Sequence, residues 1–205
     1  ITGTKRADAD ANVILNGESL GDNFGVSVAS AGDFNGDGKD DVIVGAFRDD
    51  NTGDSSGSAF IFFGGVTGTK TADTHANVIL NGQSSNDEFG FSVASAGDFN
   101  GDGKDDVIVG ADGDDGNASN SGRAFIFFGG ITGTKTADAD ADVILDGQSS
   151  NDLFGFSVAS AGDFNGDGAS DVIVAARGDD NNSESGSGSA FVFFSSGAFP
   201  SITFS

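Results

Sequence analysis

The sequence predicts an all-β fold built from three tandem repeats of about 65 residues, and three observations predict it. The segment Ile1–Lys5 returns as Val66–Lys70 and as Ile131–Lys135, at an interval of 65 residues. Short apolar runs rich in Val, Ile and Phe alternate with Gly, Asn, Asp and Ser, which is typical of strands joined by tight turns. The chain has 34 Gly but a single Pro, and this composition favours many turns over long helices.

Each repeat contains four apolar runs of strand length. In the first repeat they are Val13–Leu15, Val26–Ala29, Val42–Val44 and Ala59–Phe63. Four antiparallel strands in about 65 residues match one blade of a β-propeller, whereas a helical solenoid would need a helical periodicity that the sequence lacks. The Phe-rich fourth run is expected to pack between blades.

We expect one repeat domain over residues 1–205, with units at 1–65, 66–130 and 131–196 and a C-terminal strand at 197–205. Val13–Leu15 precedes the first Phe-Gly pair, so it is expected to be the surplus outer strand of a preceding blade. Pro200–Ser205, or the Val13 strand of a neighbouring chain, could fill the outer position of the third blade.

Three blades are too few to close a propeller ring. We therefore expect self-association, either as a dimer that closes a six-bladed ring or as a head-to-tail polymer that forms a filament. A fragment of a larger propeller is the other alternative, and it agrees with the absence of an initiator Met at Ile1.

The composition excludes several classes of partner. Thirty-two acidic and nine basic residues give a formal net charge of -23, which argues against nucleic acid. No run of eighteen apolar residues predicts insertion into a membrane. The absence of Cys excludes a disulfide framework and thiol chemistry.

An acidic turn between the second and third runs recurs in every repeat and predicts a calcium site. Calcium prefers six to eight oxygen ligands, and the nine-residue turn offers side-chain oxygens at positions 1, 3, 5 and 9 and a backbone carbonyl at position 7. Gly38, at position 6, permits the sharp turn. Three calcium ions per chain are expected, on these ligands: Asp33, Asn35, Asp37, the Lys39 carbonyl and Asp41; Asp98, Asn100, Asp102, the Lys104 carbonyl and Asp106; Asp163, Asn165, Asp167, the Ala169 carbonyl and Asp171.

Two other interpretations of this turn were weighed. An EF-hand needs Glu at position 12 and flanking helices, but apolar residues stand there: Val44, Val109 and Val174. An Asx-rich turn without metal is the structural alternative, and the recurrence of the turn at a constant interval argues against it.

The Phe24-Gly25 pair, the Asp-x-Asn-x-Asp-Gly-x-x-Asp turn and the Val-Gly-Ala that follows together resemble the FG-GAP repeat. This repeat is the blade of integrin α-type β-propellers and is shared with a fungal lectin group and many bacterial surface proteins. The resemblance covers nearly the whole chain and implies calcium loops that stabilise blades rather than catalyse. The third repeat departs from the pattern at Ala169-Ser170, in place of Lys-Asp, and at Ala175-Ala176, in place of Gly-Ala.

Other acidic residues recur at fixed positions. The pairs Asp49-Asp50, Asp114-Asp115 and Asp179-Asp180 are expected to be solvated loop acids. Turn caps are expected at three residues that precede the Phe-Gly pairs: Asp22, Asp87 and Asp152. His75 is expected at the surface. No nucleophile stands beside a base, so an enzyme is not expected.

These patterns predict an extracellular, calcium-binding structural or adhesion protein. The cytosolic calcium concentration is too low to fill sites of the affinity typical of extracellular modules, so a secreted or cell-surface location is expected. The alternative is a calcium-dependent lectin that binds glycans between blades, although the chain lacks the Trp and Tyr that stack on sugars. A glycan or a surface protein could be a partner.

Overall fold

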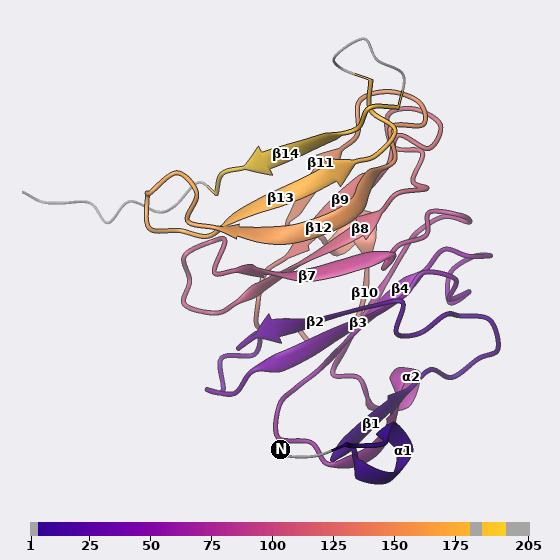
Figure 1. Cartoon of the computed structure of the whole chain (residues 1–205), viewed down its shortest axis with the longest axis vertical. Helices are drawn as coiled ribbons and strands as arrows, with labels where there is room; N and C mark the ends of the chain where they lie inside the picture. Colours follow the sequence, from indigo (N-terminus) through magenta and orange to yellow (C-terminus); the bar gives the residue numbers. More distant parts are fainter. Residues whose placement is uncertain (1–3, 181–185, 196–205) are drawn as a thin grey trace, which may run out of the picture.

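The computed structural model describes residues 4–180 and 186–195, and it confirms an all-β fold of three blade-like sheets (Figure 1). The sheets stack in sequence order along the long axis of the molecule. Blade 1 consists of β2 (Ser27–Gly32), β3 (Asp41–Ala46), β4 (Ser58–Phe62) and β6 (Val78–Asn81). Blade 2 consists of β7 (Ser92–Gly97), β8 (Asp106–Ala111), β9 (Arg123–Phe127) and β11 (Val143–Asp146). Blade 3 consists of β12 (Phe154–Gly162), β13 (Asp171–Ala176) and β14 (Ser189–Phe193).

Neighbouring strands within each blade are antiparallel, as the sequence predicted. The boundaries of blade and repeat differ, however. The outer strand β6 of blade 1 comes from the second repeat, and the outer strand β11 of blade 2 comes from the third repeat. Blades 1 and 2 are therefore each completed by the repeat that follows.

The strand β1 (Val13–Asn16) occupies the same repeat position as β6 and β11, but it has no blade to complete. Its partner is β5 (Gly68–Thr71), which pairs with it in parallel. This agrees with the predicted surplus strand. At the other end, β14 has no outer neighbour among the described residues, and the predicted strand at Pro200–Ser205 lies outside them.

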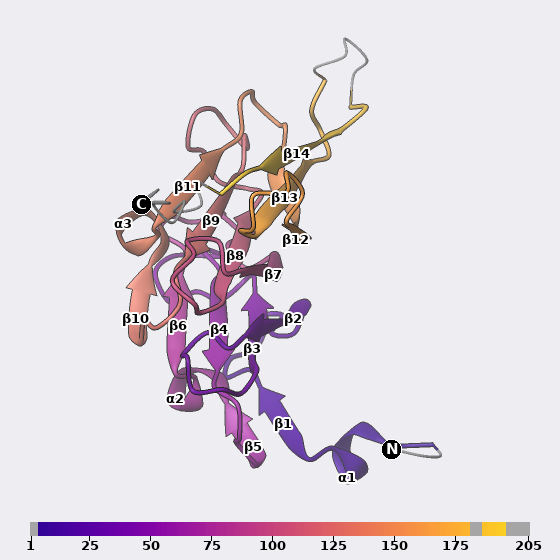
Figure 2. The same ribbon diagram turned by 90° about the vertical axis from the view of Figure 1, so that its left-hand side faces the viewer.

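The parallel strands were not predicted. Besides β5, the strand β10 (Gly133–Thr136) joins blade 1 by pairing in parallel with β6, as Figure 2 shows. Both β5 and β10 have the sequence Gly-Thr-Lys-Thr and lie in the linkers that open the second and third repeats. Three one-turn helices lie at the corresponding linkers: α1 (Ala7–Asp10), α2 (Ala72–His75) and α3 (Ala137–Asp140). In α2, the Nδ1 atom of His75 accepts a hydrogen bond from the Thr71 N–H.

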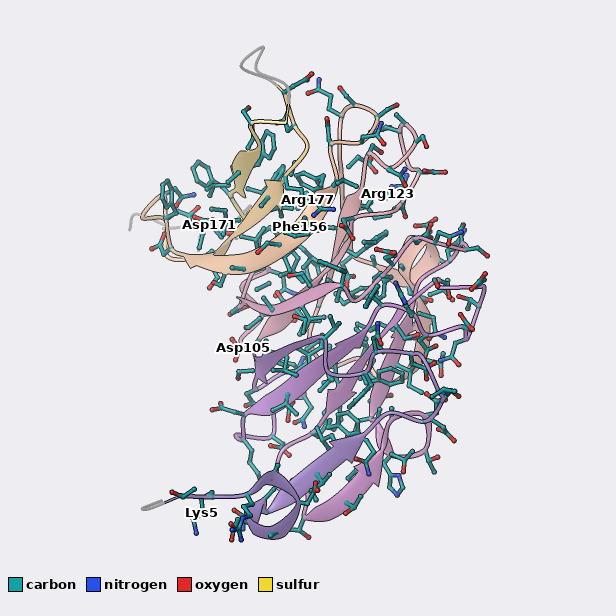
Figure 3. All side chains as sticks on the ribbon, turned by 45° about the vertical axis from the view of Figure 1, so that its right-hand side comes forward. Lys5, Asp105, Arg123, Phe156, Asp171 and Arg177 are labelled. Atoms are coloured by element: carbon teal, nitrogen blue, oxygen red, sulfur yellow. The ribbon has the colours of Figure 1, made fainter. Side chains whose placement is uncertain are left out.

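The core lies between the blades, where the sequence placed the Phe-rich strands. The Phe89 ring contacts the Phe125 and Phe127 rings at centroid distances of 5.5 and 6.3 Å, and all three are buried. Phe34, in the turn between β2 and β3, is fully buried under blade 2. On the edge of the stack away from the loops that join the first and second strands, ring contacts between Phe47, Phe91 and Phe156 link the blades. The Arg177 guanidinium lies over the Phe156 ring (Figure 3).

Adjacent blades approach each other closely at several glycines, among them one in β3 and its counterpart in β8. A Cβ atom on Gly45 of blade 1 would overlap the carbonyl oxygen of Gly90 in blade 2. A Cβ atom on Gly110 would overlap the Gly155 carbonyl oxygen of blade 3 in the same way. We call the side of a blade that bears these glycines its trailing face, and the opposite side its leading face.

Among the described residues, no helix is long and apolar enough to cross a membrane.

Candidate metal-binding loops

The three predicted calcium loops join the first and second strands of the blades, and they lie along one edge of the stack (left in Figure 1). Their glycines explain how the backbone closes so tightly. In the first loop, Gly36 and Gly38 have φ angles of 76° and 85°, in the left-handed region that favours glycine. The second and third loops have the same pairs, Gly101 with Gly103 and Gly166 with Gly168. Of these six glycines, only Gly38 was predicted from the sequence to permit the turn.

The carboxylate at position 1 is turned into its loop. Asp33 accepts hydrogen bonds from the Asp37 N–H at 2.8 Å and the Gly38 N–H at 2.9 Å. Asp98 accepts from the Asp102 and Gly103 N–H groups at 2.9 and 3.0 Å. Asp163 accepts from two N–H groups of the third loop, those of Gly166 and Gly168. Side-chain oxygens and backbone donors thus share the interior of each loop.

The residues at positions 3 and 5 lie beside each other. Asn100 and Asn165 accept from the backbone N–H at position 5 and donate to its carboxylate. The first loop differs, because the Oδ1 atom of Asn35 is buried and has no hydrogen-bond partner among the described residues. A buried amide oxygen without a donor is an acceptor available to a cation.

The carboxylate at position 9 ties each loop to the rest of its blade. Asp106 is fully buried and accepts from the Phe99 and Asn100 N–H groups at 2.8 and 3.1 Å and from the Gly129 N–H at 2.8 Å. Gly129 follows β9, so one side chain connects the loop to the third strand. Asp171 is also fully buried and makes the three matching bonds, and the fully buried Asp41 makes two of them, with the Asn35 and Gly64 N–H groups. This structural role was not recognised in the sequence.

The residue at position 8 links the loops of neighbouring blades. The Asp105 carboxylate accepts a hydrogen bond from the Asp33 N–H at 2.8 Å, and Figure 3 shows Asp105 between the ribbons of blades 1 and 2. At position 7, the Lys104 side chain extends over Gly36 and Gly130. Lys39 forms an ion pair with Asp37 in its own loop at 3.0 Å, and Ala169 donates its N–H to Asp167.

The loops fit a hard cation in donor chemistry but not in the spacing of their carboxylates. Every side chain at positions 1, 3, 5 and 9 ends in oxygen, as calcium prefers. However, in the parts of the chain that the structure describes, no three acidic or His side chains are close enough together to hold a metal ion. Backbone N–H groups satisfy most of the carboxylate oxygens instead. A cation would have to replace several of these hydrogen bonds.

The electrostatics of the loops follow burial. Burial raises the pKa of Asp106 to about 6, against the effect of its three backbone donors. Burial also raises the pKa of Asp41. The hydrogen bond from Lys39 lowers the pKa of the exposed Asp37. A cation bound at such a loop would stabilise the charged form of the buried carboxylate.

Two other groups of acids lie on the opposite edge of the stack. The predicted turn caps are confirmed, because Asp22, Asp87 and Asp152 each accept from a backbone N–H three residues earlier. The prediction of solvated pairs is wrong for the first member of each pair, since Asp49, Asp114 and Asp179 are at most 5% exposed. Asp49 accepts from the Ser58 hydroxyl, and Asp114 forms an ion pair with Arg123 at 3.4 Å. Burial between strands therefore took these carboxylates out of solvent.

Among the described residues, Asp112 is the one acidic residue whose carboxylate has a fully buried oxygen without a hydrogen-bond partner. It follows β8 and is 4% exposed, and its Oδ1 atom has no hydrogen-bond partner there. Burial, and then the charge of Glu88, raise the pKa of Asp112 to about 6, while Arg177 lowers it. The folded state therefore holds the Asp112 proton more tightly than the unfolded state does.

Asp112→Asn is expected to stabilise the protein at pH 7.5 by about 1–3 kcal/mol and to have little effect at pH 4. The pKa is about 6 in the folded state and near 3.8 in the unfolded state, so the wild type loses stability as the pH rises through this window. Urea denaturation at the two pH values measures the effect. Asp54→Asn, at an exposed position, removes the same charge and serves as the control. Equal effects of both variants at pH 7.5 would contradict the assignment.

A family model described as the FG-GAP repeat matches the chain three times, at residues 24–62, 89–127 and 154–193. Each match begins at the Phe of a Phe-Gly pair, includes one candidate loop and ends in the third strand of a blade. The matches therefore coincide with the three structural blades without their outer strands.

Several integrin α chains are similar to this protein. Integrin alpha-5 of Xenopus laevis is 34% identical over 175 residues, which cover 81% of this chain and 16% of that relative. Integrin alpha-6 of Gallus gallus is 33% identical over 171 residues, or 81% of this chain and 14% of the relative. Integrin alpha-IIb of Mus musculus is 34% identical over 170 residues, with coverage of 80% and 16%. The chain thus spans about a sixth of the length of these relatives.

Integrin α chains are extracellular adhesion proteins of the cell surface, so the predicted extracellular location is confirmed at the level of the family. The repeat interval, the blade topology, the Phe-Gly pairs and the acidic loops all agree with the matched family. The chain belongs to the FG-GAP repeat family.

Proposed function

We propose that this domain is a calcium-binding structural and adhesion module of the cell exterior, in which calcium bound at the three loops stabilises the blades. The observation that carries the proposal is the repetition of an all-oxygen loop at the same place in each blade, together with the unpartnered buried Oδ1 atom of Asn35. The similarity of this chain to integrin α chains supports the adhesion role.

The loop residues would act by holding the cation. The carboxylates at positions 1, 5 and 9, the Asn amide oxygen at position 3 and the carbonyl at position 7 would be the ligands, with the backbone N–H groups turning away as the ion enters. Bound calcium neutralises charge, which matters in a chain whose formal net charge is -23. The role is therefore one of stability, and no reaction is assigned to the loops.

Calcium at 1 mM is expected to stabilise the domain by about 0.4–1.4 kcal/mol per site if the sites bind at 10⁻⁴ to 10⁻³ M. Three sites would raise the melting temperature by on the order of 5–10 °C. Native mass spectrometry with and without a chelator counts the ions, and three per chain is the expected number. Unchanged mass and melting temperature on addition of calcium would contradict the proposal.

Asp37→Asn tests the assignment of ligands. Asp37 is exposed and contacts only its own loop, so the fold should tolerate the substitution. One calcium ion per chain should be lost at a concentration that fills all three wild-type sites. Asp40→Asn changes the neighbouring exposed acid at position 8, which is not a predicted ligand, and should retain three ions. Loss of an ion in both variants would point to net charge rather than coordination.

Self-association and glycan binding both stay predictions. Self-association into a ring or filament requires blade 3 of one chain to meet blade 1 of another. Glycan binding between blades is the alternative function. The described residues give it no specific support, because the blades approach each other closely at Gly45 and Gly110.

A further inference from the structure

The leading face of blade 1 has the residues of an interface between blades but no neighbouring blade among the described residues. Val28 and Val42 are 67% and 41% exposed on this face. The residues at the same positions of blade 2, Val93 and Val107, are 5% and 0% exposed because blade 1 covers them. The same apolar pair is therefore buried wherever a preceding blade is present.

One acceptor of this face also lacks the partner that its counterpart has in blade 2. Across the interface between blades 1 and 2, the Asp105 carboxylate accepts from the Asp33 N–H, and the Ser27 hydroxyl accepts from the Val93 N–H at 3.0 Å. Asp40 stands at the position of Asp105, but it is exposed, and no hydrogen bond to its carboxylate is present among the described residues. Blade 1 thus offers an acceptor suited to a backbone N–H of another calcium loop.

The strand β1 indicates the kind of partner. Its counterparts β6 and β11 form the outer edges of blades by pairing antiparallel with β4 and β9. Among the described residues, strand β1 pairs with β5 alone, and its other edge has no partner strand. An apolar groove between β1 and blade 1 is lined by residues that include Val13, Leu15, Val42 and Phe62. The groove and the open strand edge together fit the trailing face and third strand of another blade.

Blade 3 of a second copy cannot occupy this position in the same geometry. At both internal interfaces, a glycine of the trailing face lies against a carbonyl oxygen of the next blade. The two are so close that any Cβ atom at the glycine would overlap this oxygen. In blade 3 the matching residue is Ala175, which pairs with Ser157 and Ala190 in the register that Gly45 has with Ser27 and Ala59. The Cβ atom of Ala175 would collide with the Gly25 carbonyl of the second copy. A backbone oxygen cannot move aside without displacing its strand.

We propose that the leading face of blade 1 is a docking surface for an FG-GAP blade with glycine at the position of Gly45 and Gly110, and that Ala175 prevents a second copy of this chain from occupying it. The proposal rests on the packing of the blades and does not depend on calcium binding. The stack of blades thus has a direction, because another blade can pack on blade 1 but blade 3 cannot pack on blade 1 of a second copy. This argues against the self-association that the sequence predicted.

Ala175→Gly is expected to make the protein associate head to tail. In sedimentation velocity, the wild type should remain monomeric at concentrations at which the variant forms dimers or longer arrays, with a difference in dissociation constant of at least about tenfold. Equal association of the wild type and the variant would overturn the proposal, whether both are monomeric or both assemble. Far-UV circular dichroism verifies that the variant is folded.

A second substitution tests whether blade 1 is the receiving surface. Val28→Asp places a charge on an exposed position of that face, so it should abolish the association of the Ala175→Gly variant without affecting its fold. The double variant can then form a contact only through the trailing face of its blade 3. The wild type can form one only through the leading face of its blade 1. A mixture of the two should contain a one-to-one complex. Persistent association of the double variant with itself, or no complex in the mixture, would contradict the docking surface.

Discussion

Replacing Gly110 by alanine is expected to destabilise the domain more than any single exposed substitution, by about 1–3 kcal/mol or more. Gly110 lies on the trailing face of blade 2, and a Cβ there would overlap the carbonyl oxygen of Gly155 in blade 3. The blades would have to separate to relieve the overlap, and the core between them, which includes Phe154 and Val174, would lose its packing. Urea denaturation gives the free energy of unfolding, and a lowered slope would indicate that blade 3 detaches separately.

The chain offers a matched control at the same position of the next blade. Ala175→Gly changes the same two residue types in the opposite sense, and among the described residues no blade covers that face in the monomer, so the variant is measured at concentrations too low for it to associate. It should therefore cost only the about 0.5–1 kcal/mol that a glycine costs within a strand. If Gly110→Ala unfolds at the wild-type denaturant concentration, the close approach of blades 2 and 3 does not hold in solution.

Asp106→Ala is expected to have the second large effect, a loss of about 3 kcal/mol. The substitution leaves three backbone N–H groups without their acceptor, those of Phe99, Asn100 and Gly129. A buried donor left unsatisfied costs about 1–3 kcal/mol, and relief of the buried charge offsets part of the total. Thermal and urea denaturation in the presence of a chelator measure this structural contribution without any contribution from calcium.

Asp102→Ala separates the structural role of the loop from its proposed role in calcium binding. The Asp102 side chain is exposed and its hydrogen bonds stay within the loop, so its loss should cost little in the chelator. The same variant should lose stability relative to the wild type when calcium is added. A large loss from Asp106→Ala only in calcium would show that its backbone hydrogen bonds are not what stabilises the loop.

The fold class was predictable because its signals are local. Each strand is a short run of Val, Ile and Phe bounded by turn residues, and the recurrence of Phe24-Gly25 and of the acidic loop repeats that signal three times. Such patterns depend only on which residues are neighbours in the chain. The strand positions and the family agree with these predictions.

The parallel strands β5 and β10 were missed because the segment Gly-Thr-Lys-Thr has no apolar alternation. It becomes a strand only because β1 or the outer strand β6 presents an unpaired edge to it. The buried acids Asp49 and Asp114 were misjudged for a similar reason. Their partners, Ser58 and Arg123, come from the next strand along the chain. The sequence shows that a loop is acidic, but it does not show which of its carboxylates the fold buries.

The sequence by itself determined the repeat, the strands, the residues of the acidic loops and the left-handed glycines that close them, since all of these follow from chain neighbours and backbone sterics. Only the tertiary structure decided how the blades meet. It showed that Asp105 bonds to the loop of the preceding blade, that Asp106 joins its loop to β9, and that Gly45 is required by a carbonyl 45 residues later. These contacts join distant segments, and they exist because burial of the Phe-rich faces brings the blades together.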